Sequence, residues 1–525
     1  MQQAVRDFVF DLHDATRRSL SLAELTPLYD LKLRELNDKY FTTSPWPSAA
    51  DISSDCNSDE QFLLLYREMT LRARGMASGS FRFQAADFID SWDNYTKLFA
   101  FITNVSDHEL LLSPQWIYDI LQEFVYQFQG FCQYRTTSRA ERETQLIAAR
   151  SDGWGVSAVH STLSALISQS SAALPASSVK AQFAYFAAIE LARLECLLCD
   201  YSASIATVST LRLHDRAELF TSVPACHVNV LYHCGVSLLM LRRYPDTITV
   251  LGELTMHISR ALRPGSASLK PHVQSLLQKM LEKAVGLVAM AMALAPNHRV
   301  DDQLKELIEG KTGVEKYRRL PQGDLTTFEE VFEGACPKFI SPCAPLDAAS
   351  SASQGGSVGS NNLCQETIRL QVAGFLGEVS QHVPMLKLRS YMRMYSSIEV
   401  AKLARFNDSS SEAVVSQLVA FHHKSLQTHV PTSVSYILLR ILRFIYAYSF
   451  YSIQAKESIL TEASASSSAA KAGPGAASFY IEGGAVHMEQ STSISDKSRA
   501  AERYFIAGIR KNAEIAADLR KNCRI

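Results

Sequence analysis

The chain has almost no net charge. Its 525 residues carry 52 lysine and arginine side chains against 53 aspartate and glutamate side chains, which leaves a formal charge of −1. This balance argues against a protein whose main task is to neutralise the phosphates of a nucleic acid, because such proteins carry a basic excess. We expect any nucleic-acid contact to be local or shared with partners.

The sequence also has little that resembles a catalytic site. Neither a His-Glu-x-x-His nor a His-x-His pattern occurs. The segment "EGKTG" (Glu309–Gly313) ends like a phosphate-binding loop, but Lys305 stands where that motif needs a glycine five residues before Gly310. The pattern before it is helical, where a strand should precede the loop. The sequence therefore predicts no enzymatic activity and no cofactor.

Cysteine and histidine gather in one part of the chain: Cys196, Cys199, Cys226, His227, His233 and Cys234. On paper such residues can be arranged as a zinc site. However, the segment Cys196-Leu-Leu-Cys199 lies within an apolar helical run, where cysteine is usually a small core residue. We therefore favour core packing and predict no metal.

No export signal is evident. The opening "MQQAVRDFVFDLHDATRRSL" is charged throughout and lacks an apolar centre, so we expect a cytoplasmic chain with reduced cysteines. Val434–Ile453 has the length of a membrane span, but Arg440 and Arg443 lie inside it, and each costs about 2.5–3.5 kcal/mol near the centre of an inserted helix. We predict that this segment is buried against protein and not in a membrane.

Aromatic residues are concentrated in "EFVYQFQGFCQYR" (Glu123–Arg135). Read alone, the stretch fits either a strand or a helix, but one apolar stripe at helical spacing runs through it from upstream. The stripe consists of Trp116, Ile117, Ile120, Leu121, Phe124, Phe128 and Phe131. It predicts a core helix. A platform for stacking bases is disfavoured, because such surfaces interleave rings with several cations and only Arg135 is present.

Three segments rich in serine, glycine, proline or alanine have the composition of connectors: Thr42–Glu60, Asp347–Asn362 and Ala463–Ser478. They divide the chain into five predicted parts. These are N-terminal helices with a linker (1–60), a helical-repeat region (61–345), a serine- and glycine-rich linker (346–365), a part with a winged helix and an insert at about 428–477 (366–490), and a terminal helix (491–525).

The helical region contains a faint internal repeat. "LECLLCDYSASIATV" (Leu194–Val208) aligns with "SLLMLRRYPDTITVL" (Ser237–Leu251) at an offset of 43 residues, which matches Tyr201 with Tyr244. This period suits helical hairpins stacked as a solenoid. In each copy we expect one helix to end just before the tyrosine and the next to begin there, with the tyrosine wedged between the pair.

After the glycine-rich linker the pattern changes. "IEVAKLARFND" and "SSSEAVVSQLVAFHHK" predict two short helices, with Ser409 and Glu412 at capping-box spacing before the second. "SFYIEGGAVHMEQ" (Ser478–Gln490) predicts a hairpin with a two-residue Gly-Gly turn, in which Ile481 lies opposite Val486. A helix-turn-helix followed by a hairpin is a winged helix. Because the second helix opens with "SSSEAVV" and not with cations, we expect it to contact protein and not DNA.

Two elements are candidate partner-binding sites. The first is the edge of the hairpin, with residues Phe479, Tyr480, Ile481, Val486 and His487. An unpaired strand edge is a template for added strands. The second is a terminal helix from Asp496 to Lys521, whose apolar stripe comprises Phe505, Ile509, Ala516 and Leu519. Its fold-back onto its own winged helix is the alternative to assembly with partners.

Six segments occur in an order that resembles a known family: "SWDNY" (Ser91–Tyr95), "EFVYQFQGFCQYR", "LLMLRRYPDTITVL", "ACPKFISP" (Ala335–Pro342), "VAKLARF" and "FYIEGGAVH". A helical solenoid before a winged helix is the layout of PCI subunits. Within that class, the segments closely resemble the L-subunit family of eukaryotic translation initiation factor 3, from about residue 85 to the C-terminus. The inserts near 350 and at 428–477 depart from the family pattern.

This resemblance implies a mainly α fold: a TPR-like solenoid, then the winged helix of a PCI domain, then a C-terminal helix. It implies a non-catalytic scaffold that joins other initiation factor 3 subunits, most directly the K and E subunits, and reaches the 40S ribosomal subunit through the complex. The alternatives are a PCI subunit of the proteasome lid or the COP9 signalosome, and an RNA-binding adaptor. Direct RNA contact stays open.

Overall fold

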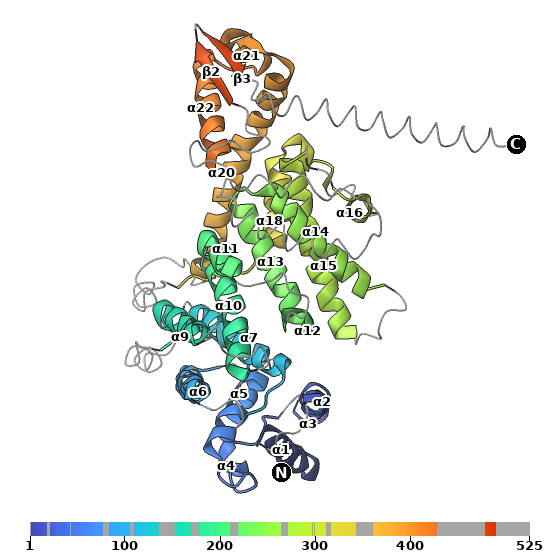
Figure 1. The fold of residues 1–525 in the computed structure, drawn as a ribbon, viewed down its shortest axis with the longest axis vertical. Helices are drawn as coiled ribbons and strands as arrows, with labels where there is room; N and C mark the ends of the chain where they lie inside the picture. Colours follow the sequence, from blue (N-terminus) through green and yellow to red (C-terminus); the bar gives the residue numbers. More distant parts are fainter. Residues whose placement is uncertain are drawn as a thin grey trace, which may run out of the picture. The chain divides into compact units, whose positions relative to one another are not determined.

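The fold comes from a computed structural model, which describes residues 2–17, 22–41, 44–76, 83–104, 110–135, 153–169, 178–210, 219–263, 271–296, 298, 300–310, 317–342, 361–427, 478–482 and 484–489. The described chain is mainly α, with helical repeats before a winged helix, as predicted (Figure 1). It forms two compact units. The first contains the described residues up to Ser380, and the second contains those from Gln381 on.

The first unit is helical throughout its regular structure. Its elements in chain order are α1 (Gln3–Arg17), α2 (Leu22–Pro27), η1 (Leu28–Lys32), α3 (Leu33–Tyr40), α4 (Ala49–Ile52), α5 (Glu60–Met76), α6 (Ala85–Asn104), α7 (Pro114–Arg135), α9 (Val156–Ser168), α10 (Val179–Leu197), α11 (Tyr201–Thr210), α12 (Leu219–Ser222), α13 (Pro224–Met240), α14 (Tyr244–Ala261), α15 (Pro271–Leu294), α16 (Asp302–Ile308), η2 (Leu320–Gln322) and α18 (Leu325–Ala335). Helix α20 (Asn361–Met394) begins in this unit and ends in the second.

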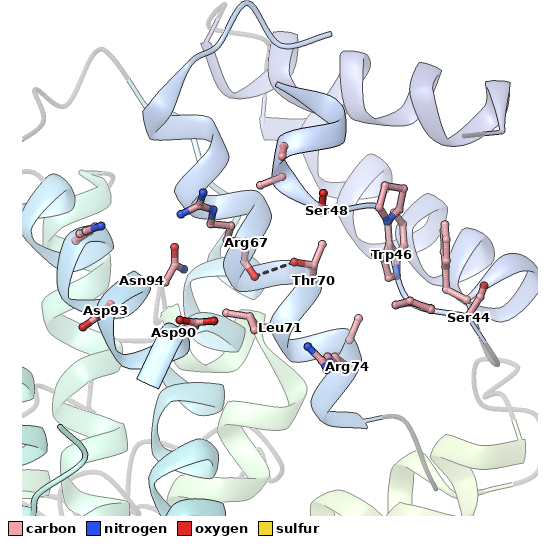
Figure 2. Close-up of a pocket in the computed structure, with 17 residues that line it drawn as sticks. Ser44, Trp46, Ser48, Arg67, Thr70, Leu71, Arg74, Asp90, Asp93 and Asn94 are labelled. Carbon is pink, nitrogen blue, oxygen red and sulfur yellow. Dashed lines mark hydrogen bonds between the residues drawn. The ribbon is translucent and has the colours of Figure 1, made fainter. Parts of the chain in front are cut away.

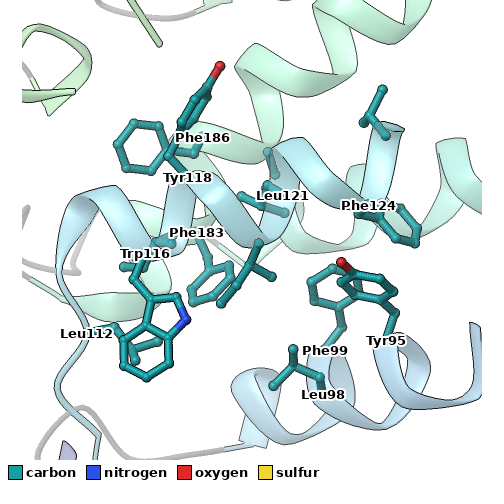
Figure 3. Packing of buried hydrophobic residues seen from close by; sticks show 14 of the residues in the cluster. Tyr95, Leu98, Phe99, Leu112, Trp116, Tyr118, Leu121, Phe124, Phe183 and Phe186 are labelled. Carbon is teal, nitrogen blue, oxygen red and sulfur yellow. The ribbon is translucent and has the colours of Figure 1, made fainter. Parts of the chain in front are cut away.

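Helix α7 is the aromatic core helix that the sequence predicts. Every residue of the predicted stripe is buried: Trp116, Ile117, Ile120, Leu121, Phe124, Phe128 and Phe131. Figure 3 shows α7 between α6 and α10, where the Phe124 ring meets Phe99 edge-on at 5.2 Å and the Tyr118 ring lies 5.5 Å from Phe186. The rings are therefore occupied by packing, which excludes this stripe as a stacking platform for bases.

The predicted repeat is present as two helical hairpins, α10–α11 and α13–α14. Helices α10 and α13 end 43 residues apart, and α11 and α14 begin 43 residues apart, at Tyr201 and Tyr244. Cys199 and Arg242 occupy equivalent places in the two turns and both have left-handed backbone angles, with φ of 67° and 64°. In both turns the next N–H donates to the carbonyl five residues back at 2.9 Å. The shared Schellman geometry confirms that the repeat is structural.

The turns of both repeats contact α20. The Tyr201 hydroxyl donates to Gln371 at 2.6 Å, and the Arg242 guanidinium lies 3.5 Å from the Glu378 carboxylate. Gln371 and Glu378 are seven residues apart and therefore lie on one face of the helix. Each tyrosine was expected to lie between its own pair of helices, whereas Tyr201 reaches with its hydroxyl to a helix outside its repeat. The beginning of α20 thus covers the ends of successive hairpins.

The two repeats share a backbone geometry but are packed with different side chains. In the second repeat, a Cβ placed on Gly235 would overlap the side chain of buried Leu251. The equivalent positions of the first repeat hold Ala192 and Val208, which line one small space between the helices. A larger residue on one helix is therefore matched by a smaller residue on the other.

The segment after α18 is held by four different helices. Tyr232 of α13 donates to the Ala335 carbonyl at 2.6 Å, and Gln129 of α7 donates to the Lys338 carbonyl at 2.9 Å. Lys283 of α15 donates to the Cys336 carbonyl at 3.3 Å, and the Ile340 N–H donates to the last carbonyl of α10 at 2.9 Å. These bonds satisfy main-chain groups that no regular ladder pairs. The "ACPKFISP" motif is thus a structural tie within the first unit.

A buried charged cluster connects α5 and α7. Arg72 is 7% exposed and lies 3.6 Å from the Glu68 carboxylate and 3.5 Å from that of Asp119. Burial raises the pKa of Glu68 to about 7 despite the nearby guanidinium, and burial also raises the pKa of Glu123 to about 7. Gln127 donates to Glu123 at 3.0 Å. Both carboxyl groups therefore stay protonated to a higher pH than an exposed carboxyl group does.

The segment Thr42–Glu60 was expected to be a connector, yet its described part is packed into the first unit. Ser48 and Asp51 form a capping box at the start of α4, and Trp46 and Ile52 are buried. Composition alone suggested a loop, because serine, proline and aspartate dominate the segment. The burial of two large apolar side chains overrides that signal.

Other predicted segments lie outside the described residues. These are the serine- and glycine-rich linker up to residue 360, the insert at about 428–477 with Val434–Ile453, and the terminal helix Asp496–Lys521. No helix in the described part of the chain combines the length and apolar character that crossing a membrane requires.

The packing of the second repeat predicts the effect of Gly235→Ala. Alanine normally favours a helix over glycine by about 1 kcal/mol, but here the added methyl group overlaps Leu251 and should lower the free energy of unfolding by about 1–3 kcal/mol. Adding Leu251→Val restores the Ala–Val pair of the first repeat and should recover most of the loss. Urea unfolding of both variants measures this, and a Gly235→Ala protein as stable as wild type would contradict the overlap.

The buried carboxyl groups predict a pH dependence. Their folded-state pKa of about 7 exceeds the ordinary 4.5, so the folded state binds more protons between these values. Stability from these groups is therefore present below pH 4.5 and is lost as pH rises through 7. The Glu68→Gln/Glu123→Gln variant should flatten this decline by about 1–3 kcal/mol between pH 5 and 7.5, as measured by urea unfolding. The exposed Glu329→Gln change is the control, and an unchanged slope in the double variant would refute the assignment.

Candidate functional site

The second unit contains a three-stranded antiparallel sheet. Its strands are β1 (Ser397–Glu399), β2 (Ser478–Glu482) and β3 (Ala485–Glu489), in the order β1-β3-β2. The hairpin register is the predicted one, with Glu482 opposite Ala485 and Ile481 opposite Val486. Helices α21 (Val400–Phe406) and α22 (Ser411–Gln427) complete the winged helix.

One face of the sheet is part of the apolar core of this unit. Ile398 of β1 lies directly opposite Val486 of β3, and both side chains are buried. The remaining core residues come from the end of α20, from α21 and from α22: Leu388, Met392, Val400, Leu403, Ala404, Val414 and Leu418. The helices thus fix the orientation of the sheet, which gives the wing a rigid support.

The turn of the hairpin is tied to the first helix of the winged helix. Gly484 has a φ of +78°, a left-handed angle that glycine adopts without steric cost. Its carbonyl accepts a hydrogen bond of 2.9 Å from the N–H of Val400, the first residue of α21. This bond anchors the closed end of the hairpin.

Strand β2 leaves one side of its backbone unpaired within the sheet. In a two-residue hairpin the pair beside the turn is hydrogen-bonded, and bonded and non-bonded pairs then alternate. By this alternation the main-chain groups of Tyr480 point to β3, whereas those of Phe479 and Ile481 point away from it. The Ile481 side chain is 39% exposed, although it lies on the same face as buried Val486. The edge therefore offers backbone donors and acceptors beside an exposed apolar side chain.

The proposed edge residues differ in accessibility. Val486 is fully buried, so its side chain supports the sheet from inside. His487 is half-buried, and its partner in register is Tyr480 on one side and Ser397 on the other. The four stripe residues of the terminal helix, Phe505, Ile509, Ala516 and Leu519, lie outside the described residues.

Two details of the winged helix differ from the sequence-based expectation. Residues Ser397–Glu399 form strand β1, whereas the pattern predicted a helix that begins at Ile398. Their partner strand is almost ninety residues away along the chain, and local patterns carry no signal for such pairing. The cap of α22 is Ser410, whose hydroxyl accepts from the Ala413 N–H at 3.2 Å, so the box expected from Ser409 and Glu412 does not form.

The cysteines and histidines considered for zinc are packed in the first unit. Cys196, Cys226 and Cys234 are buried, and the Cys196 thiol donates to the His233 carbonyl. Burial raises the pKa of Cys196 and of Cys234 to about 12, and it lowers the pKa of His233 to about 3, so thiols and imidazole are neutral. Within the described ranges no three or more His, Cys, Asp or Glu side chains are grouped to hold a metal ion.

Comparison with known proteins places the whole arrangement in a family. Residues 87–511 match the family described as RNA polymerase I-associated factor PAF67. Proteins named eukaryotic translation initiation factor 3 subunit L are similar to this chain in Danio rerio (32% identical, covering 76% of this chain and 70% of the relative), Nematostella vectensis (30%, 80% and 81%) and Homo sapiens (30%, 76% and 72%). With matches that include both the repeats and the winged helix, this chain belongs to the family of eukaryotic translation initiation factor 3 subunit L.

Proposed function

We propose that this chain is a non-catalytic scaffold subunit of translation initiation factor 3. The observation that carries the proposal is the family match over residues 87–511, which spans the helical hairpins, the tie after α18 and the winged helix. The relatives are named as subunits of that factor. Their names argue against assignment to the proteasome lid or the COP9 signalosome.

Assembly uses the open edge of β2 and the terminal helix. Main-chain groups at a strand edge pair with an added strand, while the exposed Ile481 side chain contributes apolar contact. The stripe of Phe505, Ile509, Ala516 and Leu519 is narrow and suits a bundle with helices of other subunits. A single helix cannot bury such a stripe by itself.

The direct neighbours are the K and E subunits, and the 40S ribosomal subunit is reached through the complex in the cytoplasm. The formal charge of −1 agrees with ribosome contact that is shared with other subunits. An adaptor that binds RNA through α7 is disfavoured because the α7 stripe is buried. The exposed face of α22 presents Val419 and Glu412, which suits protein more than phosphate.

We assign the roles within this scaffold to the five parts predicted from the sequence. Residues 61–345 supply the repeat region, 366–490 supply the winged helix with its insert, and 491–525 supply the assembly helix. The parts 1–60 and 346–365 are the N-terminal segment and the linker, and the last five residues of the linker begin α20.

Affinity purification of the tagged chain from cells tests the proposal. We expect the K and E subunits to be recovered in amounts comparable to the chain, together with other initiation factor 3 subunits and 40S proteins. Recovery of proteasome-lid or signalosome subunits in their place would overturn it.

A proline scan of β2 tests the edge. Ile481→Pro removes an outward N–H, so the isolated chain should melt within a few degrees of wild type while recovery of neighbouring subunits falls by about tenfold or more. Tyr480→Pro removes a donor that points to β3 and should lower both stability and recovery. Ile481→Val keeps the N–H and is the matched control. Full incorporation of the Ile481→Pro chain would count against the edge.

The terminal helix is tested by Phe505→Asp/Leu519→Asp. Two unpaired charges in a packed seam should cost several kcal/mol of association, so the variant should be lost from the complex. Thermal unfolding of the free chain separates the alternatives: unchanged melting supports packing with partners, whereas loss of folding would show that the helix folds back on its own winged helix. Arg503→Asp, whose side chain lies mostly off the stripe, is the control.

A further inference from the structure

A groove of about 570 Å³ lies in the first unit, far in sequence from the winged helix. It is bordered by α5, by α6 and by the segment between Phe41 and Ala50 (Figure 2). Its volume falls within the range of pockets that bind ligands, about 300–1,000 Å³. Helix α6 belongs to the part of the chain that matches the family, whereas α5 and the Phe41–Ala50 segment precede it. Neither the repeats nor the winged helix contributes a residue to this groove.

One wall of the groove is apolar and held in place by several bonds. The rings of Phe41 and Trp46 stack with centroids 4.1 Å apart, and the Trp46 indole N–H donates to Asn37 at 3.2 Å. The Tyr66 hydroxyl donates to the Pro47 carbonyl at 3.0 Å. These contacts hold the Phe41 and Trp46 rings in place at the groove.

The opposite wall is polar and comes from two packed helices. Helix α5 contributes Arg67, Thr70, Leu71 and Arg74, and α6 contributes Asp90, Asp93, Asn94 and Lys97. The spacing of three and four residues places each set on one helical face. Figure 2 shows the side chains of Asp90, Asp93 and Asn94 beside α5. The wall therefore presents a row of polar groups along the length of the groove.

Asn94 gives this wall a hydrogen-bond acceptor without a donor. The residue is 4% exposed, and its Nδ2 donates to the Leu64 carbonyl at 3.2 Å. Its Oδ1 is buried and has no hydrogen-bond partner in the described structure. A buried acceptor left unpaired costs about 1–3 kcal/mol. The atom has almost no accessible surface, so its pairing with a ligand N–H requires a small movement of the Asn94 side chain toward the groove.

Arg67 gives the groove a place for a single carboxylate. Arg74 is already paired with Asp87 at 2.7 Å. Within the described residues the Arg67 and Lys97 side chains form no ion pair, and both are exposed. An anion that reaches Arg67 gains a bidentate partner. The carboxylates of Asp90 and Asp93 disfavour a phosphate backbone, which would place a continuous line of negative charge beside them.

We infer that this groove binds an extended acidic peptide segment of a partner protein. An N–H of the peptide main chain donates to Asn94 Oδ1, a peptide carboxylate pairs with Arg67, and an apolar peptide side chain packs against Phe41 and Trp46. The site is independent of the winged-helix edge, so either can fail without the other.

Panning a randomised seven-residue peptide display library on the immobilised full chain tests the inference. We expect enriched sequences to combine at least one carboxylate with an apolar residue. Fluorescence anisotropy of an enriched peptide should then show that Arg67→Glu weakens binding by about tenfold or more, since a charge-assisted pair becomes a repulsion. Asp90→Asn removes a like charge and should strengthen binding severalfold.

The matched control is Arg318→Glu, which makes the same charge change at an exposed residue of the first unit outside the groove. It should bind the enriched peptide like wild type. The inference is overturned if no acidic sequence is enriched, or if Arg67→Glu and Arg318→Glu bind equally. It is also overturned if a twelve-nucleotide oligouridine binds the chain more tightly than the peptide and loses this binding in Arg67→Glu, because the groove then serves RNA.

Discussion

The structure depends on one constraint, which is that a helical hairpin cannot bury its apolar face without a neighbour. The α10–α11 and α13–α14 hairpins meet this constraint by stacking, and the beginning of α20 covers their ends through contacts at Gln371 and Glu378. The main-chain groups of the tie after α18 form hydrogen bonds with four helices, three of them with side chains. Stacked helical hairpins present an extended surface for partners, which is what a scaffold requires.

The winged helix meets the same constraint with a sheet. Ile398 and Val486 bury one face against three helices. Among the described strands β2 is paired on one side alone, and its Ile481 is exposed. The residues just before α21 form β1, which pairs with one side of β3, while β2 pairs with the other side. The packed core and the edge strand β2 therefore belong to the same small unit. Because β1 pairs with one side of β3, β2 is an edge strand of the sheet.

Periodic patterns carried most of the correct sequence-based inferences. The stripe of α7, the 43-residue repeat and the hairpin register all rest on spacing within short windows, and the structure has each of them. Strand β1, the cap at Ser410 and the burial of Trp46 were missed, because they depend on contacts with residues that are distant or on choices between adjacent serines. The groove was missed for a similar reason. Its walls come from three separate segments, none of which has a binding motif of its own.

We propose that assembly depends on the outer side of β2, which joins another subunit of initiation factor 3. Amide hydrogen exchange at single-residue resolution, compared between the isolated chain and the purified complex, tests this most directly. We expect the amides of Phe479 and Ile481 to exchange fast in the isolated chain and to become protected in the complex, whereas Tyr480 should be protected in both. Equal exchange of Phe479 and Ile481 in the two states would contradict it.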